Sequence, residues 1–170
     1  MENLLLYHRI PQNKRIESDA FLKKEIGAGI TSNSPSNLYY TNGGKGAGAV
    51  TGKFRPNDIP SWVDFNNAIG VNMIHKYDWM YAFPIFSSQI AVFDREITHM
   101  IYDQTTYEAN INIIDEAEHF DTGFSLEYLV KMYWEGFILF EDYLHNPKYP
   151  SAEILVFESI PASIISVVKK

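Results

Sequence analysis

The chain of 170 residues contains no cysteine. This absence excludes disulfide bonds, thiolate zinc sites and a cysteine nucleophile. The chain also lacks a run of about 18 apolar residues, the length that a membrane-spanning helix requires. Its first residues, MENLLLYHRI, are too short an apolar segment for a signal peptide. We therefore expect a soluble, cytoplasmic protein with no membrane partner.

Positive charge is scarce beyond the first third of the chain. Residues 1–60 contain eight Lys or Arg against five Asp or Glu, a formal charge of +3, whereas residues 61–170 contain six against sixteen, a charge of −10. An acidic chain binds nucleic acid poorly without specificity, because that binding depends on neutralising phosphates. A basic N-terminal third suits a phosphate-bearing ligand, although solvated surfaces that differ in charge would explain the same counts.

Apolar residues, at 46%, and aromatic residues, at 15%, are abundant. A chain of this size can bury a stable core, so we expect one domain over residues 1–170. Alternation and helical spacing predict an α+β fold. Strands are expected at 3–10, 81–86 and 89–93, with weaker candidates at 37–41, 99–102 and 109–114, and helices at 18–26, 61–77 and 125–145. The last twenty residues predict two apolar strands that turn at Pro161 and form a central pair.

Two polar residues stand inside expected apolar strands. Alternation places His8 on the same face as Leu6 and Ile10, where it is either a core histidine with a hydrogen-bond partner or a ligand-binding residue. Glu153 opens the first of the two C-terminal strands, and burying an unpaired carboxylate is costly. This glutamate therefore either has a function or reaches solvent or an arginine from the start of its strand.

Residues 27–60 contain seven of the ten glycines and are typical of a loop. Within them, Gly52-Lys53 lacks the spacing of a P-loop, and the GxGxx[GA] pattern at 44–49 lacks the helix that must follow it. The Gly-rich segment 43–52 is then either a surface loop or a flexible loop beside a ligand. No GxSxG turn is present, and the acidic run at 115–121 has no recognised ligand spacing, so we expect no metal.

The motifs at the two ends of the chain resemble those of the ADP-ribosyltransferases, and most closely the DarT-like toxins, which modify bases in single-stranded DNA. Members of that family open with a strand carrying Tyr-His-Ile-Thr, and residues 7–10 (YHRI) stand in that place. They close with an Ala-Glu-hydrophobic-Leu-Val strand and a turn into a hydrophobic strand, which residues 152–156 (AEILV) and 160–164 (IPASI) match. Residues 78–86 (DWMYAFPIF) are similar in character to the aromatic mid-chain segment of the family.

The resemblance implies an ADP-ribosyltransferase-like fold, a split and bent β-sheet core with flanking helices, in which His8 and Glu153 lie on adjacent central strands near the Gly-rich loop. It implies an NAD-dependent glycosyltransferase of toxin or defence type that transfers ADP-ribose to a macromolecule. The acceptor would be a protein or a nucleic-acid base, and with a base of DNA as the acceptor the activity would be DNA modification. An antitoxin would be a further partner. Glu153 would stabilise the positive charge that develops on the ribose.

The remaining site residues are also implied by the resemblance. Arg55 would be the catalytic arginine of the family or a contact to the pyrophosphate. His8 would bind the adenosine side of NAD, with Arg9 beside it in the cofactor site. The nicotinamide would stack on Tyr39 or Tyr40. Lys45 or Lys53 would contact the pyrophosphate.

Two other functions fit the same residues. An NAD glycohydrolase would use the same site without an acceptor. A non-catalytic binding or immunity module would use its acidic C-terminal two-thirds to bind a basic protein. Convergence of His8 and Glu153 on one cleft would favour an enzyme, whereas their separation would favour the binding module.

Overall fold

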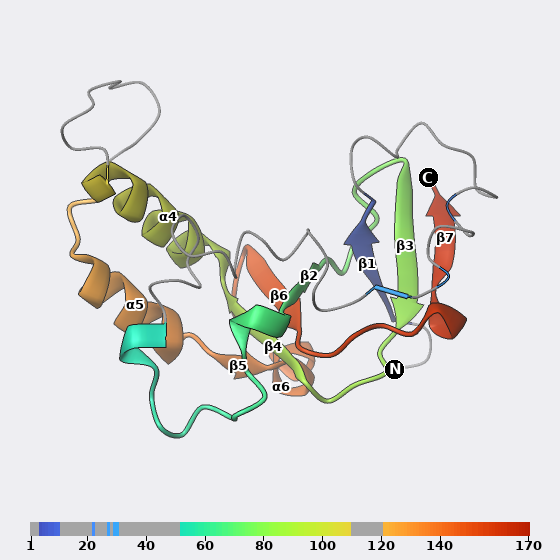
Figure 1. The fold of residues 1–170 in the computed structure, drawn as a ribbon, viewed down its shortest axis with the longest axis horizontal. Helices are drawn as coiled ribbons and strands as arrows, with labels where there is room; N and C mark the ends of the chain where they lie inside the picture. Colours follow the sequence, from blue (N-terminus) through green and yellow to red (C-terminus); the bar gives the residue numbers. More distant parts are fainter. Residues whose placement is uncertain (1–3, 11–21, 23–26, 28, 31–51, 110–120) are drawn as a thin grey trace.

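The computed structural model of the chain describes residues 4–10, 22, 27, 29–30, 52–109 and 121–170 (Figure 1). Outside these residues lie the expected strand at 37–41, nearly all of the expected strand at 109–114, most of the expected helix at 18–26 and the loop at 43–51. The strands are β1 (Leu5–Arg9), β2 (Ile69–Val71), β3 (Trp79–Pro84), β4 (Ile90–Asp94), β5 (Ile138–Leu139), β6 (Ala152–Val156) and β7 (Ser166–Lys169). The helices are α4 (Arg95–Ala109), α5 (Leu126–Glu135) and α6 (Phe140–His145), with short 3₁₀ turns η3 (Gly52–Phe54), η4 (Phe65–Asn67) and η5 (Ala162–Ile164).

The described strands form two antiparallel sheets, which confirms the predicted α+β class. One sheet has the order β1-β3-β7 and the other β2-β6-β4-β5. The sheets meet where Tyr7 and Asn72 exchange two backbone hydrogen bonds of 2.8 Å. Figure 1 shows the three-stranded sheet at one end of the molecule, the four-stranded sheet in the middle, and α4 beside α5 at the other end.

Two apolar clusters hold these layers together. The first lies between the two sheets and includes Leu6, Phe83 and Ile154. The second lies between the four-stranded sheet and the helices α4 and α5, and includes Phe93 and Tyr133. Because side chains alternate along a strand, β6 contributes to both clusters, and its two faces have different surroundings.

The first strand follows its predicted alternation. Leu6, His8 and Ile10 are buried, whereas Tyr7 is half-buried and Arg9 is exposed. Strands β3 and β4 also lie close to their predicted positions. The local pattern was sufficient in these segments, since β1 alternates and the interior residues of β3 and β4 are continuously buried.

The prediction of a helix at 61–77 was wrong, because this segment contains η4, strand β2 and an irregular stretch. Ile69 and Val71 pair with Val156 and Ile154 of β6. The weak strand prediction at 99–102 was also wrong, because these residues lie inside α4. That helix starts directly after β4, where the Asp94 carboxylate accepts a hydrogen bond of 3.0 Å from the backbone N–H of Glu96.

Residues 125–145 form two helices rather than one. Helix α5 ends at Gly136, where an added Cβ would lie 2.9 Å from the Tyr149 hydroxyl. This hydroxyl donates a hydrogen bond to the Gly136 carbonyl. The break allows β5 to pair with β4 through Ile138 and Leu139 before α6 begins.

The two C-terminal strands do not pair with each other. Strand β6 lies between β2 and β4, whereas β7 is an edge of the three-stranded sheet. Between them, Ile160 exchanges backbone hydrogen bonds of 2.8 and 2.9 Å with Ile30. The chain therefore crosses from one sheet to the other after Val156 instead of turning back on itself.

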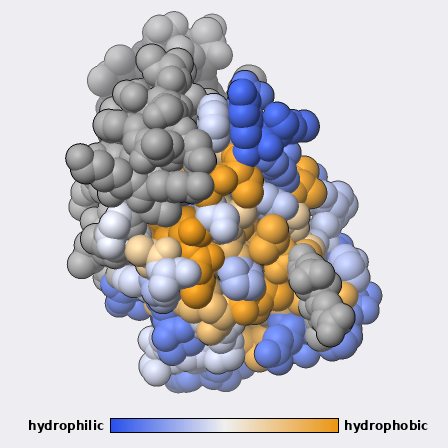
Figure 2. All heavy atoms as spheres, turned by 90° about the vertical axis from the view of Figure 1, so that its right-hand side faces the viewer, coloured by the Kyte–Doolittle hydropathy of each residue, from blue (hydrophilic) through white to orange (hydrophobic). Residues whose placement is uncertain are grey.

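Apolar side chains are visible on the end of the molecule that carries β7 (Figure 2). In β7 itself, Val167 and Val168 are half-buried, and the exposed Lys169 lies over the Trp79 ring at 5.3 Å. A lysine on a described edge strand disfavours pairing with another chain. No helix in the described part of the chain is both long and apolar enough to cross a membrane.

Candidate active site

Glu153 lies at the second position of β6 and is almost fully buried, with 4% of its surface exposed. Its Oε2 atom accepts a hydrogen bond of 2.7 Å from the Thr98 hydroxyl. The Tyr133 hydroxyl lies 3.4 Å from the same oxygen. The carboxylate is therefore buried with hydrogen-bond donors, as a buried charge requires, and is not a strand-start glutamate that reaches solvent.

Two helices bring these donors to Glu153. Thr98 lies in the first turn of α4, whose first backbone N–H, on Arg95, donates to the Ser151 carbonyl at 3.1 Å. Tyr133 comes from α5, which starts at Ser125, whose hydroxyl accepts from the Tyr128 N–H at 3.2 Å. The start of α4 is thus tied to the start of β6, and α5 has a capped N-terminus.

The Tyr133 ring is fixed by the sheet beneath it. It stacks on the Phe93 ring with a centroid distance of 4.3 Å and an interplanar angle of 2°. Phe93 is the β4 residue that pairs with Glu153 across the β4–β6 ladder. Cross-strand partners share a face of the sheet, so Phe93, Tyr133 and Glu153 form one packed group in the second cluster.

His8 lies in a different environment. Its side chain is 6% exposed, and its Nδ1 donates a hydrogen bond of 2.9 Å to the Gly70 carbonyl. Burial lowers the pKa of His8 below the usual 6.5, although the bond to Gly70 opposes this shift. A neutral imidazole that donates through Nδ1 leaves Nε2 as a hydrogen-bond acceptor.

The position of His8 explains why the sheets separate there. Beyond the Tyr7–Asn72 bridge, the next hydrogen-bonded pair of an antiparallel ladder would join Arg9 to Gly70. The His8 ring instead takes the Gly70 carbonyl that the Arg9 N–H would have occupied. The imidazole thus satisfies a backbone acceptor at the point where β1 leaves β2.

His8 and Glu153 do not share a sheet or a face, so the prediction of adjacent central strands was wrong. Strand β2 lies between their strands. His8 pairs with Tyr81 on the face that covers the first cluster, whereas Glu153 pairs with Phe93 of the second. The structure therefore does not bring these two side chains together.

A different set of residues shares the face of Glu153. The β2–β6 register pairs Val71 with Ile154, and Asn72 and Glu153 are the residues next to this pair, on the other side of the strands. Asn72 pairs in turn with Tyr7 of β1. Because facing residues of an antiparallel pair lie on the same side, Tyr7, Asn72 and Glu153 share one side of the strands, and Arg9 follows Tyr7 on that side.

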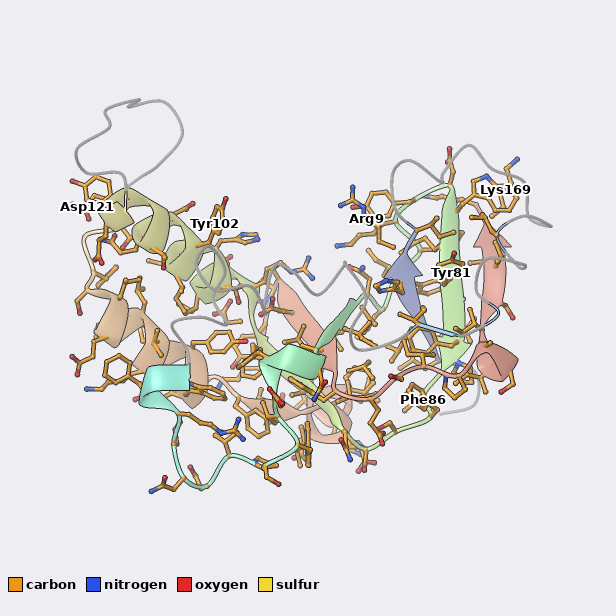
Figure 3. All side chains as sticks on the ribbon, viewed as in Figure 1. Arg9, Tyr81, Phe86, Tyr102, Asp121 and Lys169 are labelled. Atoms are coloured by element: carbon orange, nitrogen blue, oxygen red, sulfur yellow. The ribbon has the colours of Figure 1, made fainter. Side chains whose placement is uncertain are left out.

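Aromatic residues of the stretch after β2 cover this side of β1. The His75 ring stacks on Tyr7 with a centroid distance of 5.5 Å and an angle of 7°. The Arg9 guanidinium lies 5.3 Å from the centre of the Tyr77 ring, a distance suited to a cation–π contact. Figure 3 shows the Arg9 side chain extending from β1 on the side that faces α4. Among the described residues no carboxylate is recorded as an ion-pair partner of Arg9.

Arg55 holds its own loop. Its guanidinium donates to the backbone carbonyls of Val63 and Pro60, and at 3.4 Å to that of Ile59. It also lies 5.6 Å from the centre of the Trp134 ring. These contacts fix the segment before η4 against α5, and a catalytic role for Arg55 stays a prediction.

The other predicted NAD contacts cannot be placed. Tyr39, Tyr40 and Lys45 lie outside the described residues, as does nearly all of the Gly-rich loop at 43–52, and the Lys53 side chain in η3 is not described. Within the described ranges no group of three or more His, Asp or Glu side chains could hold a metal ion.

No protein-family model, curated protein or solved structure matches this chain. The sequence predicted Glu153 as a site residue but did not indicate that Thr98 and Phe93 contact it or that Asn72 lies on the same side of the strands. One signal was available for Thr98, because an aspartate directly after the apolar strand QIAVF is a typical helix N-cap.

Proposed function

We propose that this protein is an NAD-dependent ADP-ribosyltransferase in which Glu153 is the catalytic carboxylate. The observation that carries the proposal is the placement of Glu153. This carboxylate is 4% exposed and lies on a central strand, with β2 between it and the line where the two sheets separate. The end motifs YHRI and AEILV, which carry the resemblance, lie in β1 and β6, the strands on the two sides of β2.

The proposed chemistry uses a fixed negative charge. As the bond between C1′ of the ribose and the nicotinamide nitrogen breaks, its electron pair leaves with neutral nicotinamide and positive charge develops on the ribose. A carboxylate in a buried, low-dielectric site stabilises that charge more than it would in water. The nucleophile of the acceptor then forms the new bond to C1′ and releases its proton to water.

Arg9 fits the pyrophosphate of NAD better than the other predicted cations that are described. It is exposed, and it follows Tyr7 on the side of the strands that Asn72 and Glu153 share. An arginine can contact two phosphate oxygens at once through its planar guanidinium. His8 faces the first cluster, so we assign it to the junction of the sheets in preference to the adenosine of NAD.

The proposal is tested with labelled NAD, with and without single-stranded DNA and protein acceptors. Glu153→Gln keeps the size of the side chain and removes its charge, so we expect release of nicotinamide to fall by roughly 100-fold or more. Glu158→Gln is the matched control, because Glu158 is an exposed glutamate that accepts from Ser87 near the same strand. We expect this control to keep wild-type activity.

The same assay decides between this proposal and the second candidate, an acidic module that binds a basic protein. The separation of His8 from Glu153 favours that module, as does the charge of −10 over residues 61–170. It predicts that wild-type protein neither binds nor cleaves NAD. Wild-type turnover that Glu153→Gln leaves unchanged would instead remove Glu153 from the mechanism.

A further inference from the structure

We infer that Thr98 is a positioning residue for the reaction, holding the Glu153 carboxylate in its catalytic orientation. This inference rests on the proposed function and adds to it a second residue, on a different element of the fold. Thr98 does not itself touch NAD in this scheme. It acts through the hydrogen bond of 2.7 Å from its hydroxyl to Glu153 Oε2.

The hydroxyl of Thr98 has one proton and two acceptors within reach. The Asp94 carbonyl lies at 3.3 Å and Glu153 Oε2 at 2.7 Å. The usual range for an O–H···O hydrogen bond is about 2.5–3.0 Å, which the distance to Glu153 meets and the distance to Asp94 exceeds. The proton therefore points to the carboxylate, and the local bond to Asp94 is secondary.

Thr98 is itself held in place. It is 1% exposed and lies in the first turn of α4. A threonine in a helix has few side-chain conformations because it is branched at Cβ. The start of α4 is tied to the start of β6, because Asp94 pairs with Ala152 and Arg95 donates to Ser151. Donor and acceptor thus belong to one rigid corner.

Tyr133 limits the other movement of the carboxylate. Its hydroxyl is 3.4 Å from the same Oε2, and its ring rests on Phe93. A carboxylate that turned away from Thr98 would leave a buried oxygen poorly satisfied, which is costly. The orientation of Glu153 is therefore set by the corner between α4 and β6 rather than by Glu153 alone.

The helix provides a matched control at Thr105. This residue also lies in α4, but its hydroxyl donates at 2.6 Å to the Ile101 carbonyl of its own helix. Thr105→Val and Thr98→Val each replace a hydroxyl with a methyl group of similar size. Only the second removes a bond to Glu153.

The experiment measures kcat and KM for NAD cleavage in four variants. We expect Thr98→Val to lower kcat by about 10- to 100-fold with little change in KM, because a small misplacement of a catalytic group costs up to about 100-fold. Thr98→Ser keeps the hydroxyl and should restore most of the rate. Thr105→Val should match wild-type protein. Thr98→Ala serves as the second test of the hydroxyl if Thr98→Val does not fold.

Urea unfolding of Thr98→Val, Glu153→Gln and the double variant measures the coupling of the two side chains without reference to activity. Wild-type turnover with Thr98→Val and Thr105→Val alike would overturn the inference and leave the proposed function standing. A failure of Thr98→Ser to restore the rate would also overturn it. Wild-type protein that does not turn over NAD would overturn the proposed function and the role of Thr98 in it, and any measured coupling would then report a structural contact.

Discussion

Replacing His8 tests whether a neutral imidazole joins the two sheets. Two substitutions separate its roles as hydrogen-bond donor and as titrating group. His8→Phe removes the donor to the Gly70 carbonyl while retaining a ring, and His8→Asn keeps a donor near the position of Nδ1 but cannot titrate. Because the Gly70 carbonyl loses its only described side-chain donor in the first variant, we expect a loss of about 1–3 kcal/mol in the free energy of unfolding.

The pH dependence of stability follows from the direction of the pKa shift. Burial lowers the pKa of folded His8 below 6.5, the value that the unfolded chain would have. Between these two values the unfolded state binds a proton that the folded state does not. The contribution of His8 is therefore complete above pH 6.5 and decreases as the pH falls toward the lowered pKa. One proton gives a slope of at most about 1.4 kcal/mol per pH unit.

The assay is urea unfolding at several pH values between 5 and 7, followed by the fluorescence of the three tryptophans. The informative quantity is the difference in unfolding free energy between wild-type protein and His8→Asn, because the carboxylates contribute to both. We expect wild-type protein to lose stability relative to His8→Asn as the pH falls. His99→Asn, which changes an exposed histidine, is the control substitution.

A difference that stays constant from pH 7 to pH 5 would refute this account, because it would mean that His8 titrates alike in the folded and unfolded states. A His8→Phe variant as stable as wild-type protein would refute the role of the imidazole at the Gly70 carbonyl. Either result would reopen the assignment of His8 to ligand binding.

Two further predictions concern the parts of the fold that support the site. Arg55→Ala should lower the free energy of unfolding by roughly 2–4 kcal/mol, since it removes three carbonyl bonds and the Trp134 contact. Lys131→Ala removes an exposed ion pair with Glu127 and a cation–π contact at 5.9 Å with the Phe54 ring, and should cost about 1 kcal/mol or less. Equal losses in urea unfolding would contradict the role of Arg55. Gly29→Ala should cost more than Gly123→Ala in the same assay. Both glycines have a positive φ, 78° at Gly29 and 76° at Gly123. A Cβ at Gly29 would clash with the Ile160 carbonyl, whereas a Cβ at Gly123 would meet no atom of the described residues.

Much of the fold could be predicted where the pattern was local. Strands β1, β3 and β4 alternate or are continuously apolar over five or six residues, and the helix start at Ser125 has its capping residue. Strand β2 could not be predicted in this way. Its three residues, Ile69–Val71, become a strand because they pair with β6, more than 80 residues later. Pairing with a distant strand, rather than the local pattern, therefore determines the secondary structure of that segment.

The same distinction applies to the candidate site. Glu153 could be predicted as a site residue because a carboxylate at the start of an apolar strand requires a partner. The partners come from helices that lie 55 and 20 residues away in sequence. The polar sequence of α4, REITHMIYDQTTYEA, has little helical periodicity of apolar residues, so neither the helix nor the direction of Thr98 could be read from it. The surroundings of Glu153 could not be predicted because its partners are distant from it in the sequence.

The structure separates two residues that the resemblance had joined, and this separation changes what each one can do. His8 satisfies a carbonyl where the ladder between β1 and β2 ends, and its burial favours the neutral ring, so it can hold the junction without an ion pair. Glu153 lies one strand beyond β2, on the side that Arg9 and Tyr7 share, with its orientation set from α4. A ligand with a positive centre and a negative pyrophosphate has a group to match each of the two charged residues on that side, the Glu153 carboxylate and the Arg9 guanidinium. His8 faces the opposite cluster and offers no such match. If NAD binds here, the Glu153 side of the strands is therefore where it binds, and His8 affects catalysis only through the spacing of the two sheets.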